Sequence, residues 1–176
     1  MSKRVANGST RVVVRQMQAV INEERYTAQL VDEKNAFLWS VFLPSAVFLE
    51  DAPELFDDLE RYASLANTDP GIQLEFQFPT RYPTLPPFVR VVRPRFKFHT
   101  GHVTIGGSIC TEILTNNGWS TSMTMEDVLT FIHHDCIIQG QGRVDFGSNH
   151  HPFPLTEYSM WEAKEAFDRV KREHGW

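Results

Sequence analysis

Two cysteines are the residues of this chain with the greatest capacity for chemistry. Cys110 ends the segment 105–110, Ile-Gly-Gly-Ser-Ile-Cys, and Cys136 follows an apolar helical stripe. Adjacent glycines allow unusual backbone angles and close approach by a partner, so the Cys110 thiol is expected to be accessible. A thiolate is a strong nucleophile, and covalent catalysis through cysteine is common. The alternative is a buried, inert cysteine, which fits Cys136 better than Cys110.

Other kinds of catalytic site have weaker support. Seven histidines make a cysteine–histidine pair easy to assemble, so their number discriminates nothing. His133 and His134 do not chelate one ion easily together with Cys136, because adjacent helical positions point about 100° apart. The glycines before Cys110 lack the Gly-Lys-Ser/Thr of a phosphate-binding loop, and Ser108 lacks the flanks of a nucleophile elbow. We expect neither a metal site nor a phosphate-binding loop.

Composition limits the class of protein further. The 176 residues fit one domain, and 41% apolar with 12% aromatic residues can form a real core. Seventeen basic against 22 acidic residues give a net charge of -5, too acidic for a protein whose main task is binding nucleic acid. Two cysteines are too few for a disulfide scaffold or a four-cysteine zinc site.

No targeting or membrane signal is recognisable in the sequence. The most apolar segment, residues 36–49, is interrupted by Ser40, Pro44 and Ser45 and is too short to span a bilayer. The N-terminal residues are not followed by the apolar stretch of a secretory signal. We therefore expect a soluble protein of the cytoplasm, the nucleus or both, with reduced thiols.

The elements that must position Cys110 follow from hydrophobic periodicity. Residues 1–10 are predicted to form a flexible arm, and residues 11–176 a single domain beginning with a helix over 11–24. Strands are predicted at residues 26–31, 37–43, 72–78 and 88–92. An acidic helix is predicted between the second and third strands, starting near Pro53. The proline-rich segment 82–87 predicts a rigid, extended approach to the fourth strand.

The region around Cys110 itself has no period. Residues 93–122 are predicted to form a long loop, and a loop of this length in a compact domain is usually functional. A helix over 124–134 follows, with Thr124 as N-cap and Asp127 three residues on. Thr156 is predicted to cap a last helix that runs to His174. Its buried stripe is expected to contain Trp161, Phe167 and Val170.

The order of these motifs resembles the ubiquitin-conjugating enzymes. Residues 78–87, Phe-Pro-Thr-Arg-Tyr-Pro-Thr-Leu-Pro-Pro, resemble the family's proline-rich segment, and residues 107–110, Gly-Ser-Ile-Cys, resemble its active-site segment. Trp119-Ser120 lies at nearly the family's spacing beyond the cysteine, and the resemblance covers about residues 11–174. Residues 86–92 and 117–120, Gly-Arg-Val-Asp-Phe-Gly at 142–147 and the terminal His-Gly-Trp are most similar to the Q-type branch.

The resemblance implies an α+β fold with a four-stranded antiparallel meander sheet flanked by helices. It implies that Cys110 accepts ubiquitin, or a ubiquitin-like protein, as a thioester from an activating enzyme. The thioester then passes to a lysine of a protein substrate, to another acceptor or to a ubiquitin ligase, with no cofactor and no metal. Neither nucleic acid nor membrane is an expected partner. The alternative is a catalytically weak variant that binds ubiquitin or a ligase without chemistry.

Two departures from the family concern the site. Most members carry His-Pro-Asn upstream of the cysteine, and here residues 100–102 read Thr-Gly-His, which places His102 in the Asn position. His102 is a candidate catalytic residue whose imidazole N–H replaces the amide as an oxyanion donor, and its alternative is a loop residue without a catalytic role. An acidic or serine gate residue is common after the next helix, and Asp145 is the nearest carboxylate there.

Partner surfaces are also implied by the resemblance. Arg11 and Arg15 lie four residues apart on one helical face that resembles the surface that meets the activating enzyme, and a solvated face is the alternative. The loop at Thr84 and Leu85 and the loop at Trp119, Ser120 and Ser122 resemble the ligase-binding edge. The family often has an aromatic residue in the first of these loops, where this chain has Thr84.

Overall fold

A four-stranded antiparallel sheet lies at the centre of the protein. The computed structural model describes residues 2–175, with side chains from Gly8 onward. The strands follow one another in the order β1 (Thr27–Leu30), β2 (Leu38–Pro44), β3 (Gly71–Gln77) and β4 (Phe88–Arg93). Each strand pairs with its sequence neighbour, as in the register of Val41 with Leu74. The predicted meander and the α+β class are confirmed.

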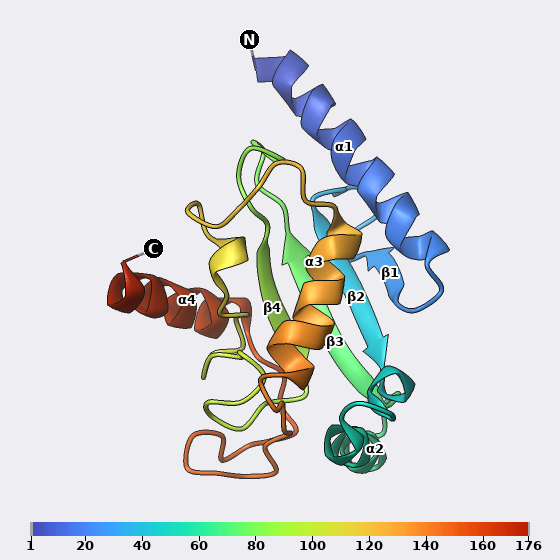
Figure 1. Ribbon diagram of the computed structural model, residues 1–176, viewed down its shortest axis with the longest axis vertical. Coiled ribbons are helices and arrows are strands. Elements are labelled where there is room, and N and C mark those ends of the chain that lie inside the picture. The colour runs from blue at the N-terminus through green and yellow to red at the C-terminus, as the bar shows by residue number, and fades with distance from the viewer. Residues whose placement is uncertain (1, 176) are drawn as a thin grey trace.

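Helices surround this sheet on several sides (Figure 1). They are α1 (Ser2–Asn22), α2 (Pro53–Ala66), α3 (Met125–Phe131) and α4 (Met160–His174), with 3₁₀ turns η1 (Ser45–Phe48) and η2 (Glu112–Leu114). A π-helical segment, η3 (Ile132–Ile138), continues α3. The α3–η3 unit crosses one face of the sheet, α1 packs against β1 and α3, and α4 lies beyond β4. The acidic helix predicted between the second and third strands is α2.

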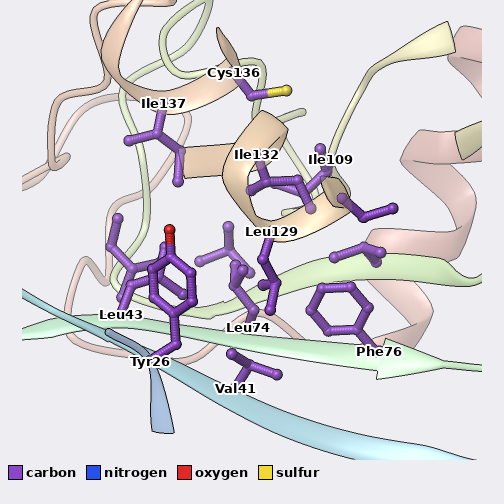
Figure 2. Packing of buried hydrophobic residues seen from close by; sticks show 14 of the residues in the cluster. Tyr26, Val41, Leu43, Leu74, Phe76, Ile109, Leu129, Ile132, Cys136 and Ile137 are labelled. Atoms are coloured by element: carbon purple, nitrogen blue, oxygen red, sulfur yellow. The ribbon is translucent and has the colours of Figure 1, made fainter. Parts of the chain in front are cut away.

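The core fills the space between the sheet and the α3–η3 unit (Figure 2). Alternate strand residues point into it, including Val41 and Leu74, because side chains alternate faces along a strand. Leu129 and Ile132 meet them from the helical side, and none of these four side chains is exposed. Each such side chain contributes roughly 1.5–3 kcal/mol through burial of apolar surface. The sheet and the crossing helix therefore form a rigid support for the long loop that follows β4.

The N-terminal boundary differs from the expectation. Helix α1 runs from Ser2 to Asn22, so it continues through residue 11, where the sequence predicts the end of an arm. Val13 and Val20 are buried beneath the helix, while Ile21, expected on the same stripe, is half exposed. The mobility of residues 1–10 stays a prediction.

Capping residues fix the ends of the last two helices. Thr124 and Asp127 form the capping box of α3 as expected. The N-cap of α4 is Ser159, which exchanges hydrogen bonds with Glu162, so the prediction of Thr156 is wrong. The Thr156 hydroxyl instead donates to the Phe153 carbonyl at 2.7 Å, closing the preceding turn. Trp161 is 69% exposed, which also corrects the predicted buried stripe of this helix.

Candidate active site

Cys110 ends a short hairpin-like excursion that is pinned to the edge of β4. The Ile109 amide donates to the Val89 carbonyl at 3.0 Å, and the Val91 amide donates to the Gly107 carbonyl at 2.7 Å. A bridge between Val103 and Ile109 closes the excursion on itself. The predicted long loop is therefore ordered around the cysteine by backbone hydrogen bonds, which hold the thiol in a fixed place relative to the sheet.

The glycines before Cys110 allow α4 to approach the cysteine segment. A Cβ on Gly106 would lie 2.1 Å from the Glu162 carbonyl oxygen, and a Cβ on Gly107 would lie 2.5 Å from the Tyr158 ring. Gly107 also has a φ of +94°, a conformation that side chains rarely adopt. The close partner that the two glycines admit is therefore the chain's own C-terminal region.

Arg95 fastens this C-terminal region to the site. Its guanidinium donates to the carbonyl oxygens of Thr156 and Glu157, each at 2.9 Å, and pairs with the Glu162 carboxylate at 3.1 Å. The same group lies 4.5 Å from the centre of the Tyr158 ring. Only 8% of Arg95 is exposed, and a buried guanidinium needs partners of this number and kind. The start of α4 is thereby locked beside the cysteine segment.

A cleft of about 510 Å³ lies between α4 and the loop that precedes the cysteine. Cys110 and His102 line it, and across from them Arg169, Val170 and Glu173 line it from one face of α4. Phe98, His99 and His174 lie among the other lining residues. The cleft is thus bounded by an imidazole-rich loop on one side and a face of mixed charge on the other.

The two cysteines have different environments. Cys110 is half-buried at the cleft, and burial raises the pKa of its thiol, so the neutral thiol is the resting form at pH 7. Cys136 lies in η3, is 1% exposed and packs in the core, as predicted for the inert cysteine. Burial is the largest influence that raises the pKa of Cys136 to about 12. Cys110 is therefore the cysteine to which an incoming group has access.

His102 is hydrogen-bonded to the backbone of Cys110 in both directions. The Cys110 amide donates to the His102 carbonyl oxygen at 2.8 Å, and His102 Nδ1 lies 3.2 Å from the Cys110 carbonyl oxygen. His102 itself has a φ of 52°, and its ring is exposed to the cleft. The residue that occupies the family's Asn position is therefore brought to the cysteine, as its spacing predicts.

Asp145 does not stand at the cleft. It is 3% exposed, and its carboxylate accepts hydrogen bonds from the amides of Gly147 and Ser148 at 3.0 and 2.9 Å. Burial would raise the pKa of this carboxyl, but the hydrogen bond from the Ser148 hydroxyl and those from the two amides outweigh it and lower the pKa. The interpretation of Asp145 as a gate residue is corrected, because its oxygens are occupied in ordering a turn.

The residues expected on partner surfaces lie in two places away from the cleft. Arg11 and Arg15 are exposed on one face of α1, where they border a shallow hollow of about 270 Å³. The loops containing Thr84 and Ser120 are linked, because Trp119 Nε1 donates to the Pro83 carbonyl at 2.7 Å. Leu85, Ser120 and Ser122 are at least partly exposed on these joined loops. Trp119, half-buried, is the residue that joins them.

The contribution of α4 to the cleft is the part of the site that sequence reasoning missed. Arg169 and Glu173 lie four residues apart and so share a helical face, but they carry no motif that marks them as lining residues. The available signal was the pair of glycines at 106 and 107, whose close partner is the helix itself.

Metal-binding clusters and membrane spans are not found among the described residues. Within residues 2–175, no group of three or more His, Cys, Asp or Glu side chains is placed to hold a metal ion. In the same part of the chain, no helix combines the length and apolar character needed to cross a membrane. His133, considered above as a metal ligand, instead bonds through Nδ1 to the Tyr26 hydroxyl at 2.9 Å.

Comparisons with known proteins assign this fold and site to a family. A family model described as ubiquitin-conjugating enzyme matches residues 70–135. The Homo sapiens protein named Ubiquitin-conjugating enzyme E2 Q-like protein 1 is 32% identical over 161 residues, which cover 90% of this chain and 91% of that protein. The solved structure of human Ubiquitin-conjugating enzyme E2 G1 matches with a TM-score of 0.51 at 21% identity, over 77% of this chain and 95% of that one. The chain belongs to the ubiquitin-conjugating enzyme family.

Its place within the family is the Q-type branch. Ubiquitin-conjugating enzyme E2 25 of Caenorhabditis elegans is 34% identical over 154 residues, covering 86% of this chain and 37% of that protein. Ubiquitin-conjugating enzyme E2 Q1 of Mus musculus is 32% identical over 154 residues, with 33% of its length covered. The chain thus spans only about a third of the length of these two relatives, while it matches nearly all of the shorter Q-like protein 1.

Proposed function

We propose that Cys110 carries ubiquitin as a thioester. The observation that carries this proposal is the contrast between the cysteines: Cys110 lines a cleft of about 510 Å³, whereas Cys136 is 1% exposed in the core. Membership of the ubiquitin-conjugating enzyme family supports the same reaction. In the loading step the Cys110 sulfur attacks the carbonyl carbon of the thioester on the activating enzyme, and that enzyme's cysteine sulfur leaves. One thioester bond replaces another, so the step needs positioning more than energy.

Discharge of the thioester would take place in the same cleft. An acceptor reaching Cys110 passes between the His102 loop and the face of α4 that bears Arg169 and Glu173. Lysines, other nucleophiles and a ligase thiol are all acceptors of the proposed reaction. A half-buried site excludes part of the water that would otherwise hydrolyse the thioester.

The proposed partners use the two surfaces described above. The activating enzyme is proposed to meet the exposed face of α1 at Arg11 and Arg15, where two cations favour an acidic partner. A ligase is proposed to contact the joined loops at Thr84, Leu85, Ser120 and Ser122, which Trp119 holds together. Charge reversal at Arg11 and Arg15 should slow loading but leave discharge of a loaded enzyme unchanged.

A loading assay tests the proposed function. The chain is incubated with an activating enzyme, ATP and ubiquitin, and the products are separated with and without a thiol reductant. An adduct of one ubiquitin that the reductant removes is the expected result, and Cys110→Ala should abolish it. A protein that only binds ubiquitin or a ligase would form no adduct, yet would show chemical-shift changes on titration with ubiquitin. That outcome would replace the proposed function with the binding alternative.

A further inference from the structure

The hydrogen bond between His102 and Cys110 identifies which ring nitrogen of His102 carries the proton. Nδ1 lies 3.2 Å from the Cys110 carbonyl oxygen, and a carbonyl oxygen can only accept a hydrogen bond. Nδ1 is therefore the donor. In a neutral imidazole the other nitrogen, Nε2, then carries a lone pair and no hydrogen. The neutral ring cannot donate from Nε2 to an oxyanion, which reverses the role expected from the sequence.

The orientation of the His102 ring is restrained on a second side. Gly140 follows the π-helical segment η3, and a Cβ added there would lie 2.8 Å from His102 Cδ2. The Gly140 carbonyl also accepts a hydrogen bond from the Gly101 amide at 2.7 Å, which ties the two loops together. The ring is held by its Nδ1 bond on one side and by close backbone on the other. Within the described residues, Nε2 has no hydrogen-bond partner of its own.

We propose that His102 is the base that takes the proton from the acceptor as it attacks the thioester on Cys110. This inference rests on the proposed function and assigns one step of it to a named atom, Nε2. His102 and Cys110 line the same cleft, and the backbone link fixes the imidazole relative to the reacting sulfur. A positioned base with a free lone pair is the arrangement that general-base catalysis requires.

The step balances with an amine as acceptor. The nitrogen lone pair attacks the thioester carbonyl carbon, a C–N bond forms, and one N–H proton moves to His102 Nε2. The tetrahedral intermediate collapses by breaking the C–S bond, and its electron pair leaves on the Cys110 sulfur. The imidazolium then returns the proton to that sulfur, giving an amide, a thiol and a neutral histidine. Burial raises the pKa of the Cys110 thiol, so the leaving sulfur is basic enough to accept the proton.

Other charged and titratable groups also face this cleft. Arg169, Glu173 and His174 face it from α4, and His99 faces it from the same loop as His102. Protonation of the acceptor itself also depends on pH. A pH profile of one protein would therefore combine several titrations, whereas the ratio of wild-type to His102-variant rates isolates the contribution of His102.

The test is single-turnover discharge of purified thioester, with the rate expressed per loaded enzyme. His102→Asn restores the amide of the family and can still donate a hydrogen bond, but it cannot act as a base. We expect it to load normally and to discharge onto free lysine about 10²-fold more slowly. His102→Gln serves as a second variant of the same kind, and His134→Asn, on an exposed residue of η3, is the matched control expected to keep the wild-type rate.

Three readouts separate a base from a structural residue. The ratio of wild-type to His102→Asn rates should rise with pH, because only deprotonated His102 accepts a proton. Free imidazole should restore discharge by His102→Ala. Hydroxylamine, which is uncharged at neutral pH and strongly nucleophilic, should discharge wild type and His102→Asn at similar rates. Equal lysine discharge by His102→Asn and wild type, or an equal loss with both nucleophiles and no imidazole rescue, would overturn the inference. Absence of any wild-type thioester would instead defeat the proposed function before discharge is measured.

Discussion

Gly106 and Glu162 approach so closely that a single methyl group cannot be placed between them. A Cβ on Gly106 would lie 2.1 Å from the Glu162 carbonyl oxygen and 2.8 Å from the Ala166 side chain. This contact couples the segment that carries Cys110 to the helix that forms the opposite wall of the cleft. The active-site cleft thus depends on the docking of α4 as much as on the central sheet.

Gly106→Ala is expected to destabilise the fold and disturb loading together. The backbone of α4 must shift to admit the methyl group, at a cost of about 3 kcal/mol for overpacking of this kind. Urea unfolding measures the free energy, and the yield of ubiquitin adduct reports on the site. Gly8→Ala is the matched control, because nothing lies within 4 Å of its added Cβ and alanine favours the helix. Equal stabilities for the two variants would contradict the proposed coupling.

The two thiols are expected to differ in reactivity toward iodoacetamide. Burial raises the pKa of Cys110, so its thiolate fraction at a given pH is lower than that of an exposed cysteine. Its alkylation rate should therefore rise with pH through a midpoint above about 8.5, the ordinary value for a free cysteine. Cys136, with a pKa of about 12 and 1% exposure, should react only after unfolding. Peptide mapping by mass spectrometry over pH 7–10 measures both, and rapid labelling of Cys136 in the folded protein would contradict the assignment.

Glu162 makes part of the stability dependent on pH. Burial would raise the pKa of Glu162, but hydrogen bonds from Ser159 and Arg95 outweigh it, and the pKa is lowered. A carboxyl with a lowered folded pKa stabilises the protein fully above its unfolded pKa, near 4.3, and loses that contribution as the pH falls through the folded pKa. Glu162→Gln should cost about 1 kcal/mol at pH 7, after allowance for its partial exposure.

The difference between wild type and Glu162→Gln should shrink as the pH falls below about 4. Thermal unfolding between pH 3 and 7 measures it, with Glu165→Gln, on an exposed residue of the same helix, as control. A difference that stays constant across this range would show that the Glu162 carboxylate does not stabilise the fold through its charge.

Much of the fold follows from local rules, and most of the cleft does not. Strand β3 alternates so regularly from Ile72 to Phe76 that only one register buries its apolar face. The capping box of Thr124 is likewise a local device that sequence reveals. Thr156 looks equally like a cap, but the Arg95 side chain bonds to its carbonyl, a contact across 61 positions. Ser159 therefore caps the helix instead.

The role of α4 in the site was beyond sequence reasoning for the same reason. Which face of α4 turns inward is decided by Gly106 and Tyr158, which belong to other parts of the chain. That rotation places Trp161 in solvent and brings Arg169 and Glu173 to the cleft. Composition predicts an amphipathic helix there, but it cannot say what the helix covers. Cys110, by contrast, could be identified from its own segment.

Trp119 is expected to matter for the ligase-binding loops more than for loading. Its indole N–H donates to the Pro83 carbonyl at 2.7 Å, and the rings of Trp119 and Tyr82 lie 6.1 Å apart. Trp119→Phe keeps an aromatic ring but loses this bond, at a cost of about 1 kcal/mol. Amide hydrogen exchange should quicken in both loops, while loading of Cys110 stays near wild type. Unchanged exchange at residues 83–87 would contradict the role of this bond.

The most direct test of the central claim is the intact mass of the loaded protein for a matched pair of cysteine variants. After incubation with activating enzyme, ATP and ubiquitin, wild type and Cys136→Ala should each gain one ubiquitin less one water. A thiol reductant should reverse the gain, and Cys110→Ala, shown by circular dichroism to be folded, should gain nothing. A reducible ubiquitin adduct on Cys110→Ala, or its absence from folded Cys136→Ala together with wild type, would contradict the assignment of Cys110 as the thioester-forming residue.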